Sequence, residues 1–159
     1  MMSSALVVVL VLAAAVAIPA QAQAAPGSTW RWVPVDLNDR VYRIFAMPPE
    51  DLQAGDCTMH TDFVEIWNST ALWVWQPLDK GYSEWSFESK TSTNANSDDI
   101  WWSQFEFWSD NELLAKTAEI RGPTMTERGQ IVVGRTDTRI PMSQSMWESI
   151  RWIRWLGRC

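Results

Sequence analysis

The sequence predicts a mainly β protein, built as a small antiparallel β-barrel with a C-terminal α-helix. Several short segments alternate apolar and polar residues, which is the period of a half-buried strand. Turn-forming residues separate these segments every 8 to 15 positions, a spacing typical of a barrel or a sandwich. Near the C-terminus the apolar period lengthens to that of a helix.

The first element is expected to be a signal peptide over residues 1–25. No charged side chain precedes Arg31, and residues 5–18 form a nearly unbroken apolar run. This run is shorter than the roughly 20 apolar residues that span a bilayer, and the small residues that follow suit signal peptidase. An uncleaved anchor is the alternative. The expected cleavage positions lie after Ala22, Ala24 or Ala25.

The remaining residues, 26–159, are expected to form a single secreted β-rich domain and to act as a monomer. The chain has 13 Lys and Arg against 19 Asp and Glu, which gives a net charge of −6. An acidic protein has no general attraction to nucleic acid or to anionic lipid. We therefore expect neither nucleic-acid binding nor stable membrane association, and a small molecule is the favoured partner.

The strands follow from the alternation. In residues 82–90, Trp85 and Phe87 fall on one face while Glu84 and Glu88 fall on the other. The predicted strands cover residues 40–47, 58–67, 71–76, 82–90, 100–108, 113–120 and 130–135. The predicted turns contain Pro48-Pro49, Gly55, the polar stretch 91–99 and Gly122-Pro123.

A helix is predicted over residues 146–156. Ser145 and Glu148 have the spacing of a capping box, and Gly157 stands where a helix C-cap is often found. Between these signals one helical face is apolar, and we expect that face to pack on the β-body. The apolar face consists of Met146, Ile150, Ile153 and Leu156.

Two cysteines and one sequon are the modification signals. Cys57 and Cys159 are an even number in a chain expected to be exported, so we predict one intramolecular disulfide. Pairing of Cys159 with a second molecule is the alternative. Asn68 opens the sequence Asn-Ser-Thr and is a candidate N-glycosylation site on a surface turn.

Tryptophan dominates the candidate binding residues, with 12 in the chain. Each buries on the order of 200 Å², so a domain of this size cannot hide all of them, and some should face a ligand. In residues 100–108, Trp102, Glu106 and Trp108 share a face, which suits an amine or a small amphiphile. Glu65 and Trp67 have the same character. Ordinary partly exposed surface is the alternative for both groups.

Catalysis is not expected, and no cofactor or metal is expected either. His60 is the only histidine, so a metal site or a hydrolytic triad would have to be built around it. Cys57 and Asp62 lie near it in sequence, but Cys57 is assigned to the disulfide. The carboxylates show no spacing that favours glycoside hydrolysis over a solvated face.

The segment Gly27-Ser28-Thr29-Trp30 resembles the G-x-W motif of lipocalins. The strand 41–45, the proline-rich turn and Cys57 at the start of an aromatic strand are similar to the divergent salivary lipocalins of ticks, which sequester host amines and lipids. The resemblance covers residues 30–108 and implies a barrel with an internal ligand cavity. It supplies no site residues, and the chain departs from the family after Leu113.

The first functional hypothesis is a secreted protein that holds a small hydrophobic or amine ligand in a tryptophan-lined cavity. The alternative is a carbohydrate-binding module, or lectin, whose exposed tryptophans stack on sugar rings. The direction of the tryptophan side chains distinguishes them, since a closed cup favours the first and a flat platform the second. A secreted hydrolase is the third, and it requires a cleft with converging carboxylates.

Overall fold

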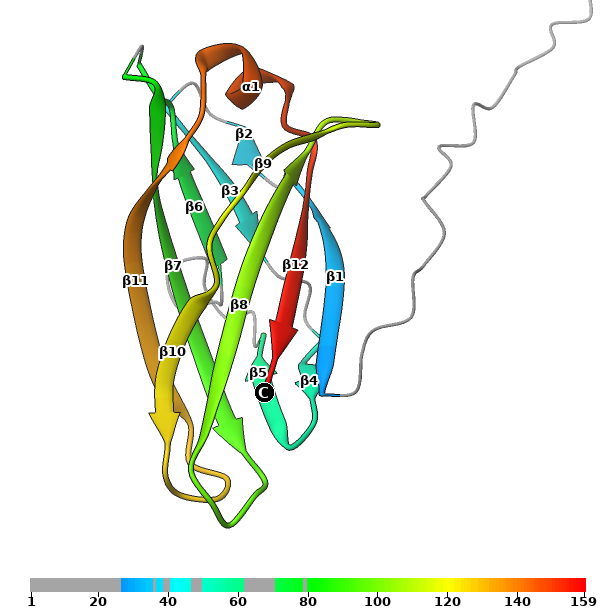
Figure 1. Cartoon of the computed structure of the whole chain (residues 1–159), viewed down its shortest axis with the longest axis vertical. Helices are drawn as coiled ribbons and strands as arrows, with labels where there is room; N and C mark the ends of the chain where they lie inside the picture. The colour runs from blue at the N-terminus through cyan, green and yellow to red at the C-terminus, as the bar shows by residue number, and fades with distance from the viewer. Residues whose placement is uncertain (1–26, 36, 39–40, 47–49, 62–70, 79) are drawn as a thin grey trace, which may run out of the picture.

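A computed structural model describes residues 27–35, 37–38, 41–46, 50–61, 71–78 and 80–159 (Figure 1). Most of these residues lie in strands, which pair antiparallel in two sheets, and one short helix precedes the last strand. The prediction of a mainly antiparallel β fold is confirmed. The ladders between the described strands keep the two sheets separate and do not join them into one closed barrel.

One sheet has five strands and contains both ends of the described chain. The last strand lies between the first strand and a long central strand, and it pairs with both along its whole length. The strands in order are β1 (Ser28–Pro34), β12 (Trp152–Arg158), β8 (Asp99–Trp108) and β10 (Ile120–Met125), with β9 (Leu113–Lys116) also pairing with β8.

The other sheet has seven strands arranged around one long strand, β7. The strands β6 and β5 follow one another along one edge of β7, each with further strands beyond it, and β11 pairs with the other edge over ten residues (Figure 1). The strands are β2 (Leu37–Asn38), β3 (Tyr42–Ala46), β6 (Ala71–Trp75), β7 (Tyr82–Thr93), β5 (Cys57–His60), β4 (Leu52–Ala54) and β11 (Val132–Pro141).

Each predicted strand overlaps one of these elements, but several bounds differ. The strand β11 runs six residues past the predicted strand 130–135, and β1, β2, β4 and β12 lie where no strand was predicted. The prediction over residues 113–120 covers two strands, β9 and the start of β10. Gly122-Pro123 is not a turn, because it lies within β10 where the register shifts between Arg121 and Thr124. Likewise β7 runs through Thr93, into the stretch predicted as a turn. The second half of the predicted strand 58–67 lies outside the described residues.

Aromatic side chains fill the space between the sheets. Phe105 on β8 packs edge-on against Phe87 on β7, with ring centroids 4.9 Å apart. The indole N–H groups of two buried tryptophans both donate to Ser103 Oγ, from Trp101 at 2.9 Å and from Trp155 at 3.1 Å. One buried hydroxyl therefore satisfies two indoles that would otherwise be costly to bury.

The predicted helix over residues 146–156 is wrong in its second half. Helix α1 covers Gln144–Ser149, and its N-cap is Ser143, whose hydroxyl accepts from the backbone N–H of Met146. The residues that follow form β12. The segment 152–158 is compatible with either period, since Ile153 lies two residues from Trp155 and also belongs, with Leu156, to the predicted apolar helical face. Pairing with two neighbouring strands favours the extended form.

Gly157 has a different role from the predicted helix cap. It lies in β12, and a Cβ atom at this position would stand 2.3 Å from Cζ2 of Trp101. Because glycine has no side chain, the Trp101 indole can pack directly against the backbone of β12 at this position.

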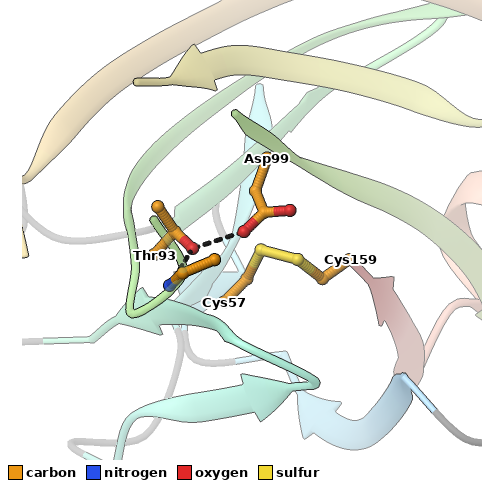
Figure 2. The surroundings of a disulfide bond; sticks show 5 residues. Cys57, Thr93, Asp99 and Cys159 are labelled. Atoms are coloured by element: carbon orange, nitrogen blue, oxygen red, sulfur yellow. Dashed lines mark hydrogen bonds between the residues drawn. A yellow bond between two sulfur atoms is a disulfide. The ribbon is translucent and has the colours of Figure 1, made fainter. Parts of the chain in front are cut away.

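The predicted disulfide between Cys57 and Cys159 is confirmed, with Cα atoms 5.8 Å apart and a separation of 102 residues. It joins β5 of the larger sheet to the end of β12 in the smaller sheet. Figure 2 shows Asp99 beside the bond, accepting a hydrogen bond from the Thr93 hydroxyl. The two sulfur atoms and an Asp99 oxygen lie within 4.8 Å of one another, but the cysteines are bonded to each other and are not metal ligands.

Candidate functional site

Five tryptophans lie on the outward side of the five-stranded sheet, which we call the tryptophan face. In each of β1, β8 and β12 they alternate with inward residues such as Val33, Phe107 and Ile153, which are almost completely buried. All five are partly exposed. The tryptophan face consists of Trp30, Trp32, Trp102, Trp108 and Trp152.

The rings on this face contact one another across strands. Trp32 on β1 and Trp108 on β8 pack edge-to-face with centroids 5.6 Å apart, although β12 lies between their strands. The Arg154 guanidinium of β12 lies 5.9 Å from the centroid of the Trp32 ring. These contacts orient the Trp32 and Trp108 rings, so this part of the face keeps its arrangement without a bound partner.

Glu106 lies beneath these rings and is 3% exposed. Its carboxylate accepts from two cations on neighbouring strands, from Arg154 Nη2 at 2.7 Å and from Lys116 Nζ at 3.3 Å. The indole N–H of Trp108 donates to the same carboxylate at 3.3 Å. The strand register explains the group, because Arg154 and Lys116 are the direct partners of Glu106 on β12 and β9.

The environment favours the ionised form of Glu106. Burial alone would raise the pKa of this carboxyl, but the hydrogen bonds from Arg154, Lys116 and Trp108 and the charge of Arg154 together lower the pKa below its ordinary value. Two cations face one carboxylate here, so the centre of the tryptophan face carries an excess of positive charge.

A second ion pair lies at the other end of the face. Arg158 donates from Nε and Nη2 to the two oxygens of Glu119, at 2.8 and 2.9 Å. Its guanidinium also lies over the Trp102 ring, 4.8 Å from the centroid. The hydrogen bond to Glu119 raises the pKa of Arg158. The carboxylate and the ring thus orient a permanently charged donor beside an exposed aromatic surface.

The structure brings together three of the predicted site residues, Trp102, Glu106 and Trp108, on the single face that their alternation predicted. The other two, Glu65 and Trp67, lie outside the described residues, as does Asn68. Sequence reasoning missed Trp30, Trp32 and Trp152. The alternation of Trp30 and Trp32 around Arg31 was a signal of a strand, but the position of that strand beside β12 depends on pairing between the two ends of the chain.

A cleft of about 540 Å³ lies between β9 and β10 on one side and β11 on the other. Its wall includes Trp85, whose indole N–H has no hydrogen-bond partner among the described residues although the side chain is buried. Thr136, Thr138 and Ile140 of β11 line the opposite wall. The volume falls within the roughly 300–1,000 Å³ typical of small-molecule sites.

No helix among the described residues has the length and apolar character needed to cross a membrane. Comparisons with known proteins give no match for this chain, whether with family models, with curated sequences or with solved structures. The functional assignment therefore depends on the geometry of the two sites.

Proposed function

We propose that this protein is a carbohydrate-binding module that recognises glycans through the tryptophan face. The observation that carries the proposal is the gathering of five partly exposed tryptophans on one side of a single sheet. A pyranose ring presents C–H groups on its faces and hydroxyls at its edge. Flat indoles supply apolar contact for the former, and Arg158 and Arg154 supply donors for the latter.

An amine ligand fits this face less well. Recognition of a cation by Glu106 needs an accessible carboxylate with unbalanced negative charge. Glu106 is buried, and two cations already compensate it. A glycan requires no such charge, and acidic glycans would benefit from the excess of cations on the face. Three cations and two carboxylates contribute to it, namely Lys116, Arg154 and Arg158 with Glu106 and Glu119.

A second candidate function is the binding of a small hydrophobic ligand in the cleft beside β11. The indole N–H of Trp85, which has no partner among the described residues, favours it, because a buried donor of this kind gains a hydrogen bond when a ligand places an acceptor there. The cleft lies at the seam between β10 and β11, where the ladders between the described strands leave the two sheets unjoined. A closed barrel would require β10 and β11 to pair. As part of this second candidate function, we propose that these two strands pair and close the barrel.

We also propose that the protein is exported, with residues 1–25 removed and with Asn68 glycosylated in a eukaryotic host. The Cys57–Cys159 disulfide supports this proposal, since such bonds persist in oxidising compartments. A protein secreted in this way would meet glycans of cell surfaces or of the extracellular matrix.

Binding of the purified protein to a glycan array, followed by calorimetry with the best glycan, tests the first proposal. Trp102→Ala and Trp108→Ala should each weaken binding by about tenfold or more, which corresponds to a loss of about 1.4 kcal/mol. Trp73→Ala is the matched control, because Trp73 is partly exposed on the larger sheet. Equal binding by all four proteins, or no glycan bound by the wild type, overturns the proposal.

The second candidate has a separate test with a panel of fatty acids, retinoids and neutral amphiphiles. Trp85→Phe removes only the indole N–H and part of the ring, so it should weaken a ligand held in the cleft and leave glycan binding unchanged. If Trp85→Phe instead abolishes glycan binding and retains lipid binding, the glycan does not bind at the tryptophan face alone and the lipid does not bind in the cleft.

A further inference from the structure

The only histidine of the chain lies between an aspartate and a serine. His60 Nδ1 is 3.1 Å from Asp51 Oδ2, and His60 Nε2 is 2.8 Å from Ser92 Oγ. Asp51 directly precedes β4, His60 ends β5, and Ser92 is near the end of β7. The three side chains therefore form a hydrogen-bonded chain across three neighbouring strands.

The strand register explains why these residues meet. In the β4–β5 hairpin Leu52 pairs with Met59, so the next position outward sets Asp51 beside His60. On the other side of β5, Thr58 pairs with Ser92 and makes Ser92 a diagonal neighbour of His60. Leu52 and Met59 are buried, so the alternating residues of the hairpin point away from the core.

The hydrogen bonds also fix the tautomer of the imidazole. A carboxylate only accepts, so in the neutral ring Nδ1 carries the proton and donates to Asp51. Nε2 is then unprotonated and accepts from the Ser92 hydroxyl. Asp51 is itself held in place, because its other oxygen, Oδ1, accepts from the backbone N–H of Thr61 at 3.0 Å.

This is the arrangement that activates a serine nucleophile, in which a base takes the hydroxyl proton and a carboxylate orients the base. We propose that Ser92 and His60 catalyse acyl transfer from carboxylic esters, with Asp51 as the positioning residue. In the sequence, the nearest residues to His60 with suitable chemistry are Cys57 and Asp62. In the fold, its partners are instead Asp51 and Ser92, which are 9 and 32 residues away in the chain.

The reaction balances with the ester and water alone. Ser92 Oγ bonds to the carbonyl carbon while its proton moves to His60 Nε2, and the bond from that carbon to the alcohol oxygen breaks as the alcohol takes this proton. Water then attacks the acyl-serine and gives its proton to His60, which returns it to Ser92 as the carboxylic acid leaves. Esters suit the site because their alcohol leaving groups need less assistance than amines.

Lys90 is placed to assist the developing negative charge. It is the direct partner of His60 in the ladder and lies two residues before Ser92 on β7, so it shares their side of the sheet. A cation beside the carbonyl oxygen stabilises the tetrahedral intermediate. The His60 side chain is 20% exposed and that of Asp51 42%, whereas Ser92 is only 7% exposed, so an ester has to reach the Ser92 hydroxyl along the exposed side of His60.

A fluorophosphonate that labels activated serines, with peptide mapping by mass spectrometry, tests the proposal on the full mature protein. The label should map to Ser92 and be absent from Ser92→Ala and His60→Gln. Ser86→Ala is the matched control, since Ser86 is a buried serine of the same strand that has no histidine partner, and this variant should label like the wild type. Near-UV circular dichroism establishes that each variant is folded.

Hydrolysis of a nitrophenyl ester gives the kinetic test. Ser92→Ala should lower kcat by about 100-fold or more. Asp51→Asn should lower kcat with little change in KM, and Asp51→Glu should recover part of the loss, which a merely structural role would not produce. A wild type that takes no label on Ser92, or a folded Ser92→Ala with the wild-type kcat, overturns the proposal.

Discussion

The Arg154 guanidinium lies 2.7 Å from the Glu106 carboxylate, beneath the partly exposed rings of the tryptophan face. Glu106→Gln keeps the shape of the side chain and leaves Arg154 and Lys116 without their counter-charge. We expect the free energy of unfolding to fall by about 1–3 kcal/mol, as for other buried charged hydrogen bonds that lose one partner. Urea denaturation followed by tryptophan fluorescence measures this difference.

Glu119→Gln is the matched control for this substitution. Glu119 also bonds to an arginine, Arg158, but both side chains are nearly half exposed. Exposed ion pairs contribute little to stability, so the control should unfold close to the wild type. A larger effect at Glu119 than at Glu106 would contradict the assignment of the buried pair as the stabilising one.

The lowered pKa of Glu106 predicts a dependence of stability on pH. In the unfolded chain this carboxyl has its ordinary value of 4.5, and in the folded protein the pKa is lower. The stabilisation of the folded state by Glu106 is therefore complete above about pH 4.5. It is lost as the pH falls through the pKa of Glu106 in the folded protein, because the unfolded state binds more protons in this range. Melting temperatures between about pH 6 and about pH 3 should fall more steeply for the wild type than for Glu106→Gln. Parallel curves would contradict this assignment.

The strand β8 could be predicted from sequence, including its two faces, because a period of two residues is a local property. The segment 152–158 could not. Its apolar residues satisfy both the helical and the extended period, and the choice depends on β1 and β8, which are far away in the chain. The same limit applies to the tryptophan face, whose members come from three strands that pair at long range.

The Asp51–His60–Ser92 chain shows this limit most clearly. The hairpin between Asp51 and His60 has local signals, since Gly55 with its positive φ of 58° forms the turn. The pairing of β5 with the far end of β7 has none, because the predicted strand ended at Lys90 and left Ser92 in a polar turn. Because β7 continues to Thr93, Ser92 lies on the same face of the sheet as His60.

The disulfide gives a prediction about processing and stability together. Non-reducing peptide mapping of the secreted protein should find Cys57 joined to Cys159 and a first residue between Gln23 and Pro26. Replacing both cysteines by serine should cost about 4–5 kcal/mol in the loop-entropy model, given the long loop that the bond closes. Two free thiols, or an intact Met1 in the secreted material, would contradict it.

The last prediction concerns Gly157, where the sequence suggested a helix cap and the structure has a strand. A methyl group here would stand 2.3 Å from Cζ2 of Trp101, whose indole is 1% exposed and donates to Ser103. The ring would have to shift from its buried position and from its hydrogen bond to Ser103, so Gly157→Ala should destabilise the fold by about 1–3 kcal/mol through overpacking. A substitution at another glycine such as Gly129 is a poor control, because Gly129 has a positive φ.

The control is therefore the double variant Gly157→Ala with Trp101→Phe, in which the ring is shorter. Denaturant titration should show that Trp101→Phe lowers the free energy of unfolding less in the Gly157→Ala background than in the wild type. If Gly157→Ala alone leaves the midpoint unchanged, or if the two costs simply add, the close packing of these two residues does not limit stability.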